Sequence, residues 1–239
     1  RDNDLVNLLW MNFYKKRLDN IPEKNDIKRY ITKQYYGYKW YEIFDFFEFL
    51  IEFSSDYSDY LYGSFIDKCN TVLEKENSAY RIINKQFIPI TNEIEIDAIT
   101  KAIEVTAQYI AIEGANKHLS TALKYLSDRK EPDYRNSIKE SISAVENIAA
   151  IISGSKTDSL GKSLSNISSK IKIHGALQKG YQIIYGYTSD ADGIRHCIIE
   201  EENCEYEDAL YMLVSCSAFI NYLISKANKA NIDLNIIPD

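Results

Sequence analysis

An arginine and a histidine stand side by side at the end of a polar stretch, Tyr185-Gly-Tyr-Thr-Ser-Asp-Ala-Asp-Gly-Ile-Arg-His196. The planar guanidinium of Arg195 matches the oxygens of a phosphate group and stays charged. An imidazole such as that of His196 can take up or release a proton near neutral pH. The two residue types together predict a site that binds a phosphate and moves a proton.

The residues before this pair favour turns. Gly186 and Gly193 allow a left-handed backbone. Three side-chain oxygens favour turns or helix caps and could contact a substrate, those of Thr188, Ser189 and Asp190. We therefore predict a loop over 185–196 that presents Arg195 and His196 where the last helix begins. In the alternative, Arg195 pairs with Asp190 or Asp192 and the segment is a structural capped turn.

A second polar group lies on the helix expected after Pro132. Asn136, Lys139, Glu140 and Ser143 recur at three- and four-residue spacing and share one helix face, which Glu146 continues. The residues predicted to contact substrate are Arg135, Asn136 and Lys139. Glu140 or Glu146 would orient Arg195 or His196. The alternative is a charged face that is only solvated.

Other titratable residues offer weaker signals. We expect His118 to be a satisfied surface or core residue. His174 follows Lys170 and Lys172, a small basic patch that could touch phosphate or could be exposed loop. No spacing of Cys and His suits zinc, and no glycine-rich nucleotide motif is present, so no cofactor is predicted.

The elements that must position these residues are mostly helical by periodicity. The predicted helices span 3–18, 24–35, 38–53, 62–75, 93–113, 115–126, 132–152, 159–171, 175–184 and 205–231. A short hairpin over 80–90 is expected, with Pro89 at an exposed edge or a strand end. Thr91 or Asn92 would cap the next helix. The sequence therefore predicts an all-α protein with a helical N-terminal module that holds the hairpin (1–92) and an antiparallel bundle (93–239).

Charge and cysteine usage limit the classes of function. The net charge is −7; residues 1–95 hold 13 basic and 16 acidic side chains, which gives −3 and leaves −4 for residues 96–239. Neither half has the basic excess of a dedicated nucleic-acid binder, although an enzyme needs only a local basic cleft. The four scattered cysteines favour reduced thiols and a cytoplasmic location, with Cys216 in the core. Charged and polar interruptions predict no membrane-spanning segment and no membrane partner.

The C-terminal part resembles HEPN-type modules of abortive-infection proteins. The matching stretches are 132–146, 157–164, Tyr185-Gly-Tyr-Thr-Ser-Asp190, Gly193-Ile-Arg-His196 and 208–223. The N-terminal third resembles the AbiJ-type N-terminal domain through Trp40-Tyr-Glu-Ile-Phe-Asp-Phe-Phe-Glu-Phe49, 70–76, 79–83 and 89–91. The aromatic residues around 40–53 could also serve a small-ligand sensor, but we interpret them mainly as core.

The resemblance implies a helical HEPN bundle that pairs with a second copy, and a role in bacterial defence against phage. In many relatives that role is metal-independent RNA cleavage, for which Arg195 would bind the scissile phosphate and His196 would shuttle the proton. Such ribonucleases usually separate the arginine from the histidine by four to six residues, whereas here the two are adjacent. Two hypotheses stay open: an endoribonuclease acting as a homodimer, or a non-catalytic HEPN module that dimerises or binds RNA, a phage protein or a defence partner.

Overall fold

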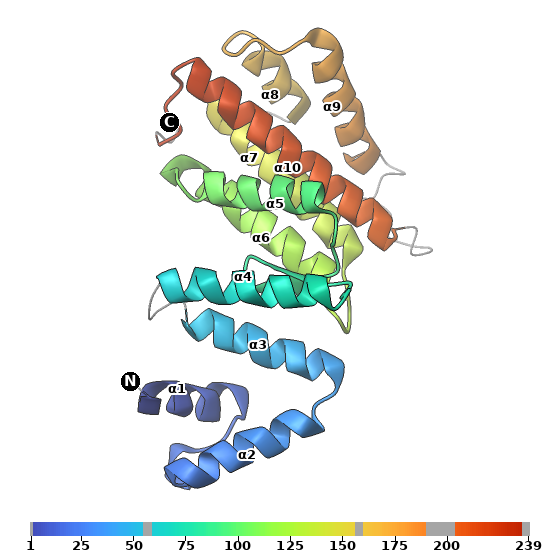
Figure 1. Ribbon diagram of the computed structural model, residues 1–239. Coiled ribbons are helices and arrows are strands. Elements are labelled where there is room, and N and C mark those ends of the chain that lie inside the picture. The colour runs from blue at the N-terminus through green and yellow to red at the C-terminus, as the bar shows by residue number, and fades with distance from the viewer. Residues whose placement is uncertain (1, 55–58, 156–159, 190–203, 236–239) are drawn as a thin grey trace. The chain divides into compact units, whose positions relative to one another are not determined.

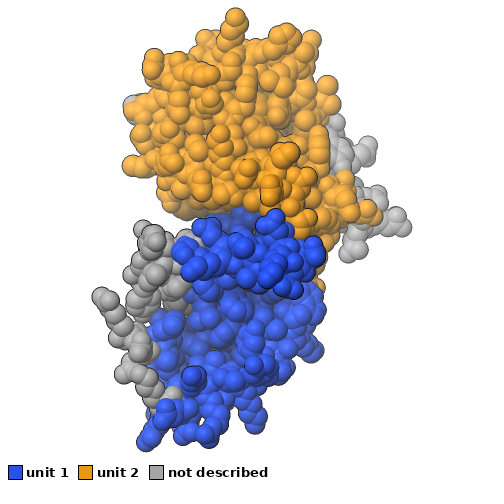
Figure 2. Space-filling view, in the orientation of Figure 1, with its two compact units in different colours: residues 1–87 blue, residues 88–239 orange. Residues whose placement is uncertain are grey.

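The computed structural model describes residues 2–54, 59–155, 160–189 and 204–235. The chain divides into two compact units, Arg1–Phe87 and Ile88–Asp239, called unit 1 and unit 2 below (Figure 2). Over the described ranges, ten α-helices and one two-stranded sheet make up the regular structure, apart from short helical turns (Figure 1). The predicted all-α class with a small hairpin is confirmed. The predicted functional boundary between residues 92 and 93 stays a prediction.

Unit 1 begins with a helix that is shorter than expected. α1 (Asp2–Leu8) runs into a π-helical turn (Leu9–Phe13), and a 3-10 turn (Leu18–Asn20) follows later. The predicted helix over 3–18 is therefore wrong in its second half. Lys15 has a φ of 54°, which breaks the helix, and Trp10 Nε1 donates to the Arg17 carbonyl at 2.9 Å, which holds the chain reversal.

Three longer helices follow in unit 1: α2 (Lys24–Gly37), α3 (Trp40–Ser54) and α4 (Asp59–Lys75). α3 packs on two sides, as its wide aromatic surface predicted. On one side Phe46 lies edge-on to Phe13, with ring centroids 5.4 Å apart. On the other, Phe44 stacks on Phe87 at 4.2 Å. Ile51, which is fully buried, anchors this second cluster.

The hairpin pairs β1 (Arg81–Ile83) with β2 (Gln86–Ile88). Its two turn residues, Asn84 and Lys85, both have positive φ, at 47° and 70°, as a type I′ turn requires. Side chains satisfy the backbone of these short strands. Asn70 accepts from Ile82 N at 2.7 Å and donates to Ile82 O at 3.0 Å. Glu48 accepts from Phe87 N at 2.7 Å. Pro89 directly follows β2, as predicted.

Unit 2 is a bundle of four main helices: α5 (Glu93–Thr106), α6 (Glu113–Ser127), α7 (Tyr134–Ser153) and α10 (Tyr206–Lys229). α7 packs against both α6 and α10, and α10 also packs against α5. α8 (Leu160–Ile167) and α9 (Gly175–Ser189) form a further pair beside the ends of α7 and α10 (Figure 1). Asp133 caps the start of α7, and Gly154, with φ 74°, ends it.

Two helix predictions in unit 2 need correction. The helix predicted over 93–113 ends at Thr106, whose hydroxyl donates back to the carbonyl of Ala102 at 2.7 Å. Gly114 does not interrupt a helix but lies in the first turn of α6. A Cβ at Gly114 would lie 2.7 Å from Asn147 Nδ2, so glycine is needed there for close packing against α7.

α10 is apolar because it lies in the core of unit 2. It is the one helix within the described ranges that is long and apolar enough to span a membrane by length and composition, and half of its apolar window is buried. The prediction that no segment reaches that length was wrong, because the charged residues of α10 lie only in its first and last turns. Its buried side includes Met212, Cys216 and Phe219. Packing within the bundle accounts for this composition.

We expect Asn92→Ala to lower the free energy of unfolding by about 1 kcal/mol. Asn92 Oδ1 accepts from the backbone N of Ile94 at 3.0 Å and of Glu95 at 3.4 Å, and so caps α5. Thr91→Ala is the matched control, since Thr91 is exposed and is not the cap. Equal urea midpoints for the two variants would show that the cap contributes nothing.

Burial raises the pKa of the Cys216 thiol to about 12. A raised pKa means that the folded state favours the neutral thiol. The stability that comes from burying the neutral Cys216 thiol is therefore complete below the ordinary thiol pKa of 9.0. It is lost as the pH rises toward about 12. Iodoacetamide at pH 8 should leave Cys216 unmodified in the folded protein and label it in urea, as read by peptide mass spectrometry. Rapid labelling without urea would place Cys216 outside the core.

Candidate functional site

The predicted pair Arg195 and His196 lies outside the described residues, as does Asp190. The segment before it is partly different from the prediction. α9 continues to Ser189, so Tyr185 to Ser189 is helical where a loop was predicted, and the rest of the predicted loop lies outside the described residues. Thr188 and Ser189 therefore belong to the last turn of a helix. Apolar and aromatic residues up to Tyr187 extend the helical pattern across Gly186, which we had interpreted as a turn residue.

The start of α7 holds two of the residues predicted to contact substrate. Asp133 Oδ1 accepts from Asn136 N at 2.9 Å, and Asp133 Oδ2 accepts from Asn136 Nδ2 at 2.6 Å. Asn136 thus helps to fasten the first turn of α7. Arg135 is half-buried beside this cap. Lys139, one turn further on, is exposed.

This end of α7 lies beside the start of α10. The rings of Tyr134 and Tyr206 meet edge-on with centroids 6.1 Å apart, and the Tyr206 hydroxyl donates to the Pro89 carbonyl. Burial raises the pKa of the Cys204 thiol to about 11; Asp208 raises it further, whereas the positive charge of Arg135 lowers it. Cys204 is the first described residue after the segment that carries Arg195 and His196.

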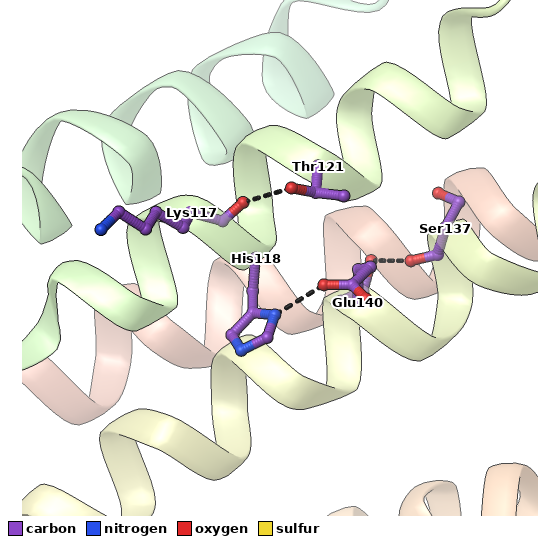
Figure 3. A network of polar contacts seen from close by, with 6 residues as sticks. Lys117, His118, Thr121, Ser137 and Glu140 are labelled. Atoms are coloured by element: carbon purple, nitrogen blue, oxygen red, sulfur yellow. Dashed lines mark hydrogen bonds and ion pairs between the residues drawn. The ribbon is translucent and has the colours of Figure 1, made fainter.

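Glu140, one helical turn after Asn136 on α7, is hydrogen-bonded to His118 of α6. His118 Nδ1 and Glu140 Oε2 are 2.6 Å apart (Figure 3). An ionised carboxylate can only accept a hydrogen bond, so Nδ1 of His118 must carry the N–H that donates to Glu140. In the neutral imidazole, Nε2 then carries no hydrogen and can accept a proton. Figure 3 shows Nε2 on the side of the ring away from Glu140. The side chains are 38% and 20% exposed, so solvent reaches this carboxylate-oriented imidazole.

The antiparallel register of α6 and α7 brings this pair together. Ser137 Oγ donates to the Ala122 carbonyl at 2.8 Å on one side of it. On the other side Asn147 packs against Gly114. Two contacts of α7 therefore flank the His118–Glu140 pair along α6. We call these three contacts the α6–α7 polar seam.

Sequence reasoning missed both His118 and Asn147 as members of this seam. Asn147 lies seven residues after Glu140, two helical turns, and so shares its face better than Glu146 does. Its Oδ1 atom is buried and has no hydrogen-bond partner among the residues that the structure describes. Glu146 is half-buried and is not part of the seam. Helix spacing could have identified Asn147, but His118 required knowledge of how α6 and α7 are aligned.

The described residues contain no cluster of three or more His, Cys, Asp or Glu side chains suited to a metal ion. The three cysteines among them, Cys69, Cys204 and Cys216, are free thiols. The chemistry available in this part of unit 2 therefore comes from an oriented imidazole, a carboxylate and the cation of Arg135.

Comparison with known proteins identifies one part of the chain. Residues 3–105 match the family described as AbiJ N-terminal domain 4. The chain thus carries an AbiJ-type N-terminal domain, which spans all of the helices of unit 1, the hairpin and most of α5. Such a domain indicates a bacterial abortive-infection defence protein. No curated protein and no solved structure matches the chain. The HEPN-like nature of the remainder stays a prediction.

Glu140→Ala should lower the free energy of unfolding by about 1–2 kcal/mol, because it leaves the half-buried His118 without its partner. Lys139→Ala, at the neighbouring exposed position, should change it by less than about 0.5 kcal/mol. A double-mutant cycle with His118→Gln, measured by urea unfolding, isolates the pairwise energy. A coupling energy of zero would show that the contact does not link α6 to α7.

Proposed function

We propose that this protein is an anti-phage abortive-infection protein whose residues 93–239 form a HEPN-like bundle that cleaves RNA as a homodimer, without a metal. The observation that carries the proposal is the AbiJ-type domain at residues 3–105. The helical bundle that follows it, with the HEPN-like sequence stretches, supports the second half. In this proposal the N-terminal domain senses a trigger or selects a substrate.

The proposed reaction is attack of an RNA 2′-hydroxyl on the adjacent phosphorus. A base removes the proton of the 2′-hydroxyl, the P–O5′ bond breaks, and an acid protonates the leaving 5′ oxygen. The products are a 2′,3′-cyclic phosphate and a 5′-hydroxyl. Arg195 neutralises the phosphate, and His196 transfers the protons, with the second copy of the chain completing the site across a two-fold axis.

The described neighbours of that segment fit these roles unequally. The positive charge of Arg135 acts on Cys204, just before α10, and can add to the positive potential for a phosphate. Glu140 is bonded to His118 and Glu146 has an interaction of its own, so neither is set apart as the residue that orients Arg195 or His196. Asn136 and Lys139 would contact RNA only beside the α7 cap, where Asn136 is bonded to Asp133.

A second candidate function is a non-catalytic HEPN module that dimerises or binds RNA, a phage protein or a defence-system partner. Two observations favour it. The arginine directly precedes the histidine instead of standing four to six residues away. Glu140 and Asn136 have structural partners within unit 2. In this case the protein would act through assembly instead of cleavage.

Incubation of total RNA with the purified protein in chelator separates the two candidates. Cleavage with 2′,3′-cyclic phosphate ends is expected for the parent protein and for Arg29→Ala, a control at an exposed arginine of unit 1. The variant Arg195→Ala/His196→Ala should lose at least about 100-fold in rate, because it lacks both the phosphate cation and the proton carrier.

Intact RNA with all three proteins, together with phage protection that survives the double substitution, would exclude the nuclease and support the second candidate. Sedimentation provides the independent check on pairing. The chain has a mass of 27.6 kDa, and the composite site requires a species of twice that mass. A monomer at micromolar concentration that still cleaves RNA would exclude a site shared between two copies.

A further inference from the structure

The α8–α9 region carries a charge opposite to that of the rest of the chain. Residues 160–189 contain four lysines and no aspartate or glutamate. The whole chain has a net charge of −7, so the remaining residues sum to −11 (−7 − 4 = −11). Such local separation of charge creates a positive potential that an acidic protein otherwise lacks.

All four lysines are exposed. Together with His174 they define what we call the α8–α9 basic surface: Lys162, Lys170, Lys172, His174 and Lys179. α8 buries Leu160, Leu164 and Ile167, which places Lys162 on its opposite side. Gln182 Nε2 donates to the Gly161 carbonyl at 3.1 Å, so a second face of α8 is covered by α9.

Helix stability accounts for Lys170, whose Nζ would lie 3.0 Å from a Cβ at Gly154, the residue that ends α7, but it does not account for Lys162 or His174. Lys162 is the third residue of α8, and His174 directly precedes α9. The backbone N–H groups at a helix start carry partial positive charge, so cations there are unfavourable and anions favourable. Neither α8 nor α9 has an acidic residue in its first turn. This placement of cations at helix starts is unfavourable for α8 and α9 alone and becomes favourable when an anion is bound there.

His174 adds a directed donor. Its Nδ1 accepts from Ala176 N at 3.2 Å, so in the neutral ring the proton lies on Nε2. His174 is exposed, and an Nε2–H can donate to a phosphate oxygen. The surface thus combines four point charges, suited to a phosphate backbone, with a hydrogen-bond donor at the start of α9.

We propose that the α8–α9 basic surface binds the phosphodiester backbone of single-stranded RNA. The inference rests on the proposed function, because RNA is the substrate that the proposed function names. RNA fits better than a lipid surface. Lys170 and Lys172 lie on the connection between the helices, next to exposed Ser168 and Ser169, whereas the exposed apolar side chains of this region, Leu177 and Ile183, lie on α9.

Binding of a fluorescent 30-nucleotide uridine RNA, measured by anisotropy in chelator at several salt concentrations, tests this assignment. Four lysines on a single strand should give a slope of log K against log salt of about −3. The variant Lys162→Gln/Lys170→Gln/Lys172→Gln/Lys179→Gln should bind at least about tenfold more weakly at 50 mM salt and lose most of that slope. The control Lys28→Gln/Lys33→Gln/Lys68→Gln/Lys101→Gln removes four exposed lysines elsewhere, reaches the same net charge of −11, and should bind like the parent.

Equal weakening in both quadruple variants would overturn the proposal, because net charge alone would then explain binding. Absence of RNA binding by the parent at 50 mM salt, or retention of the protein on phosphatidylserine vesicles instead, would overturn it as well. The variant Arg195→Ala/His196→Ala makes the two proposals separable. It should keep RNA binding whether or not the parent cleaves, so lost cleavage with intact binding leaves the surface assignment in place.

Discussion

The antiparallel register of α6 and α7 is the constraint on which the arrangement of unit 2 depends. Two hydrogen bonds and one close packing contact fix it: Ser137 to the Ala122 carbonyl, His118 to Glu140, and Asn147 against Gly114. Apolar side chains tolerate sliding by small steps, whereas a buried or half-buried hydrogen bond that loses its partner costs about 1–3 kcal/mol. The seam therefore favours the observed alignment over one in which these hydrogen bonds are lost. Because α7 also packs against α8 and α10, this alignment sets where their ends lie.

This constraint also decides which polar residues of α7 can serve a ligand. A stripe at three- and four-residue spacing looked uniform in the sequence, yet its members differ in the structure. Asn136 is bonded to the Asp133 cap, Glu140 is bonded to His118, and Lys139 is exposed. In the first turn of α7, the positive charge of Arg135 acts on Cys204, where the described part of the chain resumes before α10. The candidate site is therefore narrower along α7 than the stripe suggested.

Local signals in the sequence predicted most of the elements, because their causes are local. Asn92 as a helix cap, Gly154 as a helix end, and Asn84-Lys85 as a tight turn each follow from the backbone preference of a few residues. Errors arose where tertiary packing decided the outcome. Gly114 looked like a helix breaker but makes room for Asn147, and Tyr185–Ser189 looked like a loop but continues α9. The His118–Glu140 pair joins residues 22 positions apart and could not be found by spacing.

The distribution of charge carries information that net charge conceals. A value of −7, shared almost evenly by the two halves of the sequence, argued against a dedicated nucleic-acid binder but left room for a local basic cleft. Net charge sums the charges of segments that lie on different surfaces of the folded protein, so it hides a local excess of lysines. Since exposed charges act over about one Debye length, ~8 Å at physiological salt, a phosphate at α8 and α9 interacts mainly with the lysines there and little with distant carboxylates. An acidic chain can thus hold a polyanion at one surface, while its remaining charge of −11 repels the same polyanion elsewhere and restricts where it docks.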